Sequence, residues 1–136
     1  MDTTDLKIIS HLKNHGRATI KEISAVVNLS SPAVTERMKR LEENGVIKGY
    51  RTEIDYAKLG KAIQAFVAVD VEPKKYENFC TFCTDHPQIL SHFHIIGPHN
   101  AMLHIAVASS EELSQLLSRI QFFGVSQTSV ILNRIF

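Results

Sequence analysis

The stretch "LSSPAVTERMKRLEENGVIKGY", residues 29–50, contains a helix start, a helix and a helix stop in one run. Ser30 or Ser31 can accept a backbone N–H as the N-cap. Pro32 fits the first helical turn, because the N–H that it lacks would have no partner there. The Asn-Gly pair at 44–45 supplies a left-handed stop. The stretch therefore predicts one helix with well-defined ends.

The two faces of this helix differ in character. Val34, Met38 and Leu41 recur at the spacing of a single helical stripe, which predicts that they are buried. Most of the remaining side chains are polar and face outward. The outward residues with partner-binding chemistry, together with the cap, are Ser30, Ser31, Pro32, Thr35, Glu36, Arg37, Lys39 and Arg40.

The segments around this helix suggest a small DNA-binding unit. Residues 4–15 have helical periodicity, and Thr19 with Glu22 forms a capping box that opens a second helix. Residues 46–47 and 50–54 have the composition of a short β wing. Three helices with a tight second-to-third connection, followed by a wing, are typical of a winged helix-turn-helix.

In such a unit the first part of the second helix of the motif enters the major groove of a duplex. Thr35 and Glu36 would then reach base edges, and Ser30 and Ser31 would bind phosphate. Arg37, Lys39 and Arg40 would pair with phosphate or read guanine, and Arg51 on the wing would reach the adjacent backbone. The alternative is a solvated helix face on an ordinary three-helix core.

The charge distribution favours a polyanionic partner for the first half only. Residues 1–61 contain eleven basic and eight acidic side chains, a net charge of +3, whereas residues 62–136 contain four basic and six acidic ones, a net charge of −2. This asymmetry agrees with a nucleic-acid partner for the first half.

The second half has a different pattern. Residues 55–61 read as a linker, and the pattern after it predicts the order βαββαβ over residues 62–136. The expected strands are 65–71, 89–96, 102–108 and 125–135, and the expected helices are 74–84 and 109–122. This order is ferredoxin-like, with one antiparallel sheet and two helices on one face. The chain is therefore predicted to be α+β, with a winged helix-turn-helix over residues 1–54.

Two clusters in the second half allow other readings. Cys80 and Cys83 form a C-x-x-C, which we interpret as core packing on one helix face rather than a redox or zinc pair. His92, His94 and His104 lie on one predicted hairpin, where the strand register decides whether all three share a face. Three imidazoles on one face would bind a transition metal; otherwise they are sheet or interface residues.

Composition excludes several classes of protein. Hydrophobic residues make up 44% of the 136 and charged residues 21%, as in a folded soluble protein. There is no apolar run of membrane-spanning length and no signal-peptide pattern, so a cytoplasmic location is expected. No phosphate-binding loop, nucleophile elbow or zinc-protease motif is present, so we expect no enzyme activity, no cofactor and no metal.

The chain closely resembles the Lrp/AsnC family of transcription regulators over nearly its whole length. The specific part is the run L-S-x-x-x-V-x-x-R-x-x-x-L-E-x-x-G-x-I, which here begins at Leu29 and ends at Ile47. The resemblance implies a DNA-binding winged helix-turn-helix and a βαββαβ domain that forms dimers, which often assemble to octamers. It also implies a small-molecule effector, commonly an amino acid.

The family places this effector near a Gly-x-x-Asp turn between the two central strands. The corresponding turn here is Gly97, Pro98, His99 and Asn100, so asparagine stands where the family usually has aspartate. Asparagine forms turn hydrogen bonds without a charge, which predicts weak amino-acid binding or a different ligand. The glycine is expected to use a positive φ and to let a ligand approach the backbone.

The sequence therefore predicts a DNA-binding transcription regulator that responds to a small molecule. Two alternatives stay open. One is a metal- or haem-binding enzyme or sensor on the same scaffold, and the other is an architectural DNA-binding protein that needs no effector.

Overall fold

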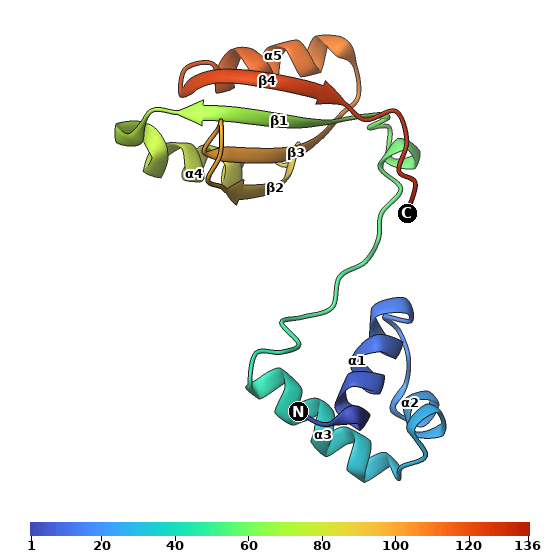
Figure 1. Cartoon of the computed structure of the whole chain (residues 1–136). Helices are drawn as coiled ribbons and strands as arrows, with labels where there is room; N and C mark the ends of the chain where they lie inside the picture. Colours follow the sequence, from blue (N-terminus) through green and yellow to red (C-terminus); the bar gives the residue numbers. More distant parts are fainter. The chain divides into compact units, whose positions relative to one another are not determined.

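The computed structural model describes all 136 residues. The chain divides into two compact units, Met1–Ile54 and Asp55–Phe136 (Figure 1). Each unit has a hydrophobic core of its own, one built from helices alone and one from a sheet with helices. No helix is long and apolar enough to cross a membrane.

The first unit contains the three predicted helices, α1 (Thr3–Asn14), α2 (Ile20–Val27) and α3 (Ser31–Glu43). The capping box of Thr19 and Glu22 is present at the start of α2. Ile8, Ile23, Val34 and Leu41 form the buried core, and Met38 packs against it from the predicted stripe of α3. The local signals in the sequence therefore placed these helices correctly.

The predicted β wing does not form as strands. The backbone N–H groups of Val46 and Ile47 both donate to the Leu41 carbonyl, at 2.9 and 3.0 Å, and so close the end of α3 instead of starting a ladder. Residues 48–54 are irregular and extended, with no partner strand in the chain. A strand needs a neighbour to satisfy its backbone groups, and β-prone composition cannot supply one.

The second unit has the predicted ferredoxin-like order. Its elements are η1 (Tyr56–Leu59), β1 (Ile63–Val71), η2 (Pro73–Lys75), α4 (Tyr76–Asp85), β2 (Ile89–His94), β3 (Ala101–Val107), α5 (Ser110–Ile120) and β4 (Gly124–Val130). The four strands form one antiparallel sheet in the order β2-β3-β1-β4. The last strand ends at Val130 and not at 135. The Ile131 N–H still donates to the Gln64 carbonyl at 2.8 Å, but β1 begins at Ile63, so residues 133–135 have no partner in it.

Both helices pack on the same face of this sheet. The core joins the inward residues of β1 and β3 to Phe79 and Cys83 of α4 and to Leu116 and Ile120 of α5. Cys80, which we expected in this core, is exposed because it faces away from the sheet. The second face of the sheet has no helix over it; we call it the open face. Its residues are Gln64, Phe66, Ala68, Asp70, Ser91, Phe93, Met102, His104, Ala106, Val125, Gln127 and Ser129.

Candidate functional site

The connection between α2 and α3 is tight and held at several points. Asn28 ends α2 with a left-handed backbone, φ 56°, which asparagine tolerates better than most residues. The Ser30 hydroxyl caps α3 by accepting the Ala33 N–H at 3.3 Å. The hydroxyl oxygens of Ser24 and Ser31 lie 3.3 Å apart and connect the two helices. The turn therefore fixes the direction in which α3 leaves α2.

The outer face of α3 presents most of the predicted contact residues to solvent. Ser31, Pro32, Thr35, Glu36, Lys39 and Arg40 are all exposed. The Thr35 hydroxyl donates to the Ser31 carbonyl at 2.9 Å, which leaves its oxygen free to accept. The Lys39 ammonium lies 3.9 Å from Glu43, and Arg40 has no ion pair. This face can therefore reach both bases and phosphates.

Arg37 differs from its neighbours on α3. One guanidinium nitrogen lies 2.7 Å from a carboxylate oxygen of Asp2 and 2.9 Å from one of Asp5, so the side chain joins α3 to the start of α1. Hydrogen bonds from the Asp5 backbone and from Arg37 lower the pKa of Asp2 to about 2, and the contacts with Asp2 and Asp5 raise the pKa of Arg37. Its charge is thus already matched by two carboxylates within the chain.

This clamp was missed at the sequence level. Asp2 and Asp5 form a capping box at the start of α1. The sequence D-x-x-D indicates that capping box. No local pattern indicates that its carboxylates pair with Arg37, more than thirty positions away. Arg51, the remaining predicted contact in this unit, is exposed on the irregular segment after α3.

In the second unit, the predicted effector turn lies between β2 and β3, and Asn100 is its fixed point. The Asn100 side chain accepts the Val71 N–H at 2.8 Å and donates to the Val71 carbonyl at 2.9 Å. Its backbone carbonyl accepts the Ile95 N–H at 3.0 Å and the Tyr76 hydroxyl at 3.2 Å. Asn100 therefore ties the turn to the end of β1 and to α4, and these bonds use one N–H and one oxygen lone pair of its amide.

The other turn residues are less constrained. Gly97 is not at a positive φ, contrary to expectation, and a Cβ there would meet no atom within 4 Å. Pro98 is exposed, and the buried Nδ1 of His99 has no hydrogen-bond partner. The space around Gly97, rather than its backbone conformation, leaves the turn open to a ligand.

The strand register separates the histidines. His92 lies opposite Leu103, on the helix-covered face, where its Nε2 is 3.0 Å from the Tyr76 hydroxyl. His104 lies on the open face, with its Nε2 2.9 Å from the Gln64 amide oxygen. Burial lowers the pKa of both imidazoles, and for His92 the nearby His94 adds to the effect. The three histidines do not converge, and no group of three metal-binding side chains occurs in the chain.

The C-x-x-C does not have the properties of a redox pair. Burial, with a smaller contribution from Cys80, raises the pKa of the Cys83 thiol to about 12. Because the thiolate is the reactive form, this shift does not favour a redox role for Cys83. Its side chain instead fills the core beneath α4.

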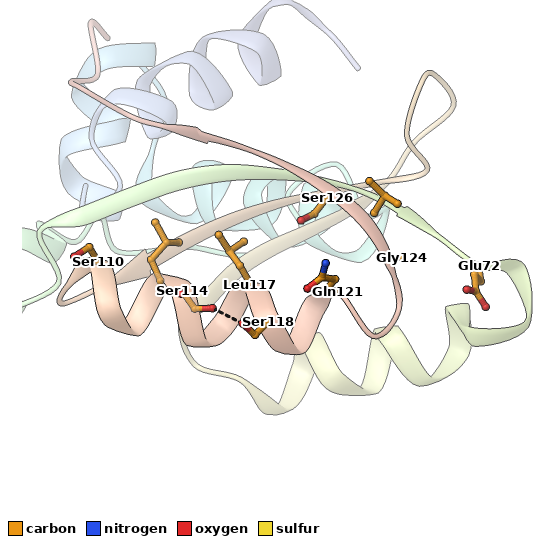
Figure 2. Close-up of a pocket in the computed structure, with 10 residues that line it drawn as sticks. Glu72, Ser110, Ser114, Leu117, Ser118, Gln121, Gly124 and Ser126 are labelled. Carbon is orange, nitrogen blue, oxygen red and sulfur yellow. Dashed lines mark hydrogen bonds between the residues drawn. The ribbon is translucent and has the colours of Figure 1, made fainter.

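A groove of about 580 Å³ runs between α5 and the edge strand β4 (Figure 2). Three serine hydroxyls of α5, at Ser110, Ser114 and Ser118, line one side, and Gly124 and Ser126 of β4 line another. No residue of the Gly97–Asn100 turn lines it. The groove and the predicted effector turn are therefore different places on the second unit.

Comparison with known proteins matches both units. Residues 1–48 match the family model described as a winged helix-turn-helix DNA-binding domain, and residues 64–136 match the Lrp/AsnC ligand binding domain. The HTH-type transcriptional regulator YezC of Bacillus subtilis, itself uncharacterized, is 37% identical over 133 residues, which cover 98% of this chain and 94% of YezC.

Solved structures agree with these matches. The structure of LrpC from Bacillus subtilis covers 100% of this chain and 97% of its own, at 33% identity and a TM-score of 0.93. The regulator NMB0573 of Neisseria meningitidis, solved as a complex with L-Met, has 27% identity and a TM-score of 0.91 and covers 100% of this chain and 92% of its own. The chain therefore belongs to the Lrp/AsnC family and is a DNA-binding transcription regulator with a ligand-binding second domain.

Proposed function

We propose that the chain binds specific sequences of double-stranded DNA through the exposed face of α3. The observation that carries this proposal is the capped start of α3 after a fixed turn, with the opposite face of the helix packed into the core. Thr35 and Glu36 would contact base edges, and Ser30, Ser31 and Pro32 would lie against the backbone. Lys39, Arg40 and Arg51 would pair with phosphates. Arg37 is reassigned from DNA contact to holding α3 in place.

The Lys39→Ala/Arg40→Ala variant should bind all DNA sequences more weakly. Each phosphate contact releases counterions that contribute about 0.9 to the salt slope of affinity, so losing two contacts should lower the slope by about 1.8. Thr35→Ala should instead alter sequence preference, and Arg37→Met should lower the melting temperature while keeping the slope. Fluorescence anisotropy at several salt concentrations measures the slope and the sequence preference, and circular dichroism measures the melting temperature. An unchanged slope in the double variant would remove α3 from the proposed interface.

We further propose that the chain acts as a homodimer, assembling to larger oligomers, through the open face of the sheet. This face exposes Phe66 and Phe93, at 47% and 59%. Its titratable side chains are His104, opposite Phe66, and Asp70 near the end of β1. Two copies related by a two-fold axis would bury these rings against each other. A dimer would also present two α3 helices to two half-sites of DNA.

Phe66→Asp should convert the assembly to monomers, because it places an unpaired carboxylate at the centre of the proposed contact. Light scattering at micromolar concentration measures the mass. Val26→Asp is the matched control, since Val26 is similarly exposed at 48% but lies on α2 in the first unit. A wild-type mass for Phe66→Asp would place the interface elsewhere.

A small molecule is proposed to act on the second unit, and the complex of NMB0573 with L-Met suggests an amino acid. We propose the turn of Gly97, Pro98 and His99 as its site, with Asn100 holding the turn in position. Asn100 offers no carboxylate to an α-ammonium group, which favours weak amino-acid binding or another ligand.

One experiment separates this proposal from its alternatives. Genomic fragments bound by the purified protein would be identified, and binding repeated with each of the twenty amino acids. Specific fragments whose binding changes with a ligand support an effector-controlled regulator. Binding that ignores both sequence and ligand would indicate an architectural protein instead. We infer that the chain regulates transcription without catalysing a reaction, as the names of its relatives suggest.

A further inference from the structure

The first unit has a depression of its own, between the end of α1 and the irregular segment after α3. Its volume is about 610 Å³. Ile9 and Leu12 of α1, with Val46 and Ile47, give it apolar lining. Lys13 and Arg17 line it from the α1 side, and Lys48 and Arg51 from the segment opposite. We call this depression the basic groove.

Positive charge in this unit is concentrated in the basic groove and not on α3. Helix α3 contains three basic and three acidic side chains, so its net charge is zero. The whole unit, residues 1–54, has nine basic and seven acidic side chains, a net charge of +2. The basic groove has four basic residues and one acidic residue, Glu53, a net charge of +3.

The four cations of the basic groove are available to a partner. No carboxylate lies within ion-pair distance of Lys13, Arg17, Lys48 or Arg51. Glu53 is the one carboxylate in the lining. Glu42, just outside it, accepts the Tyr50 hydroxyl at 2.9 Å. Four exposed cations facing one another across a groove repel each other, and an anionic partner would relieve that repulsion.

The backbone around the basic groove adds donors and access. The N–H groups of residues 48–52 make no backbone hydrogen bond, so they are free to donate. At Gly16 and Gly49, a Cβ would meet no atom within 4 Å, so both sites are open to a close approach. Successive phosphates of a nucleic-acid strand carry one charge each, and the sugars between them have apolar faces. That alternation matches a basic rim around an apolar floor.

We propose that the basic groove binds the sugar–phosphate backbone of DNA and adds to the sequence-independent part of the binding energy. The proposal rests on the proposed DNA-binding function and adds a contact surface to it. In this division α3 selects the sequence, while Lys13, Arg17, Lys48 and Arg51 neutralise phosphates. A small anion or an acidic peptide would be the competing occupants.

The test uses the full chain and a random-sequence DNA duplex. Lys13→Gln/Arg17→Gln should lower the salt slope by about 1.8, because two phosphate contacts are lost. Lys48→Gln/Arg51→Gln should produce a similar loss from the other side of the basic groove. Neither variant should change the ratio of affinities between a bound genomic fragment and the random duplex. Both replaced pairs are exposed, and circular dichroism checks that the variants fold.

Lys7→Gln is the matched control, because Lys7 is an exposed cation of α1 that does not line the basic groove. It should keep the wild-type slope. A loss of about 0.9 for Lys7→Gln, half that of a double variant, would show that net charge, and not the basic groove, is responsible. A wild-type slope in both double variants, with DNA binding intact, would overturn the basic groove and leave the proposed function standing. Absence of DNA binding by the wild type would overturn both.

Discussion

Gly124→Ala is expected to unfold the second unit. Gly124 opens β4 opposite Val71, where the two backbones lie so close that an added Cβ would collide with the carbonyl oxygen of Asp70. The same Cβ would lie 2.7 Å from the Asp70 carbonyl carbon and 3.1 Å from the Val71 Cα. These are backbone atoms of a paired strand, so relief requires separating β4 from β1. We expect a loss of at least about 4 kcal/mol in the free energy of unfolding.

Thermal and urea denaturation followed by circular dichroism measure this loss. Gly97→Ala is the control within the same unit, because a Cβ at that glycine meets no atom within 4 Å. It should stay within about 0.5 kcal/mol of the wild type. If Gly124→Ala has the melting temperature of the wild type, the backbones of β4 and β1 are not as close at Gly124 and Asp70 as described.

Asn100→Asp is expected to destabilise the same unit by about 2 kcal/mol at neutral pH. A carboxylate can still accept the Val71 N–H, but it cannot donate to the Val71 carbonyl, and the two oxygens would face each other at the present 2.9 Å. The carbonyl facing it should raise the pKa of this carboxyl above its ordinary value of about 4. The defect should therefore shrink as the pH falls from neutrality and have disappeared at about pH 4, because the protonated form regains a donor.

The urea midpoint at neutral and acidic pH measures this effect. Asn133→Asp makes the same chemical change at an exposed position and should have the stability of the wild type. If Asn100→Asp is as stable as the wild type at neutral pH, the amide does not hold the turn. The Asn100→Asp variant also separates the structural role of the turn from ligand binding. A cationic ligand at the turn would bind this variant more tightly than the wild type, although the variant is less stable.

The helices of the first unit could be predicted because their signals are local. Thr19 with Glu22 marks the start of α2, and Ser30 with Pro32 marks the start of α3. The two residues of each pair lie within four positions in the sequence. The wing could not be predicted on the same basis, because a strand depends on a neighbour that composition does not identify. The end of β4 was misplaced for a related reason, since residues 133–135 extend past the first residue of β1, Ile63, and have no neighbouring strand.

The candidate sites show the same limit. The exposed face of α3 was predicted from its periodicity, but the partner of Arg37 lies at the far end of the unit in sequence. His104 could be placed on a face only once the register of β3 was known. The basic groove was missed because its two sides come from residues 13–17 and 48–51, which no motif connects.

The clamp between Arg37 and the first aspartates bears on how such a regulator can diversify. Two carboxylates hold this guanidinium, and Val34 and Leu41 fill the core, so the orientation of α3 does not depend on Thr35 or Glu36. Thr35 and Glu36 can therefore mutate freely without loosening the scaffold. On the proposed interface, a duplicated copy of the gene would acquire new target promoters through one or two substitutions, while its affinity for the phosphate backbone stayed the same.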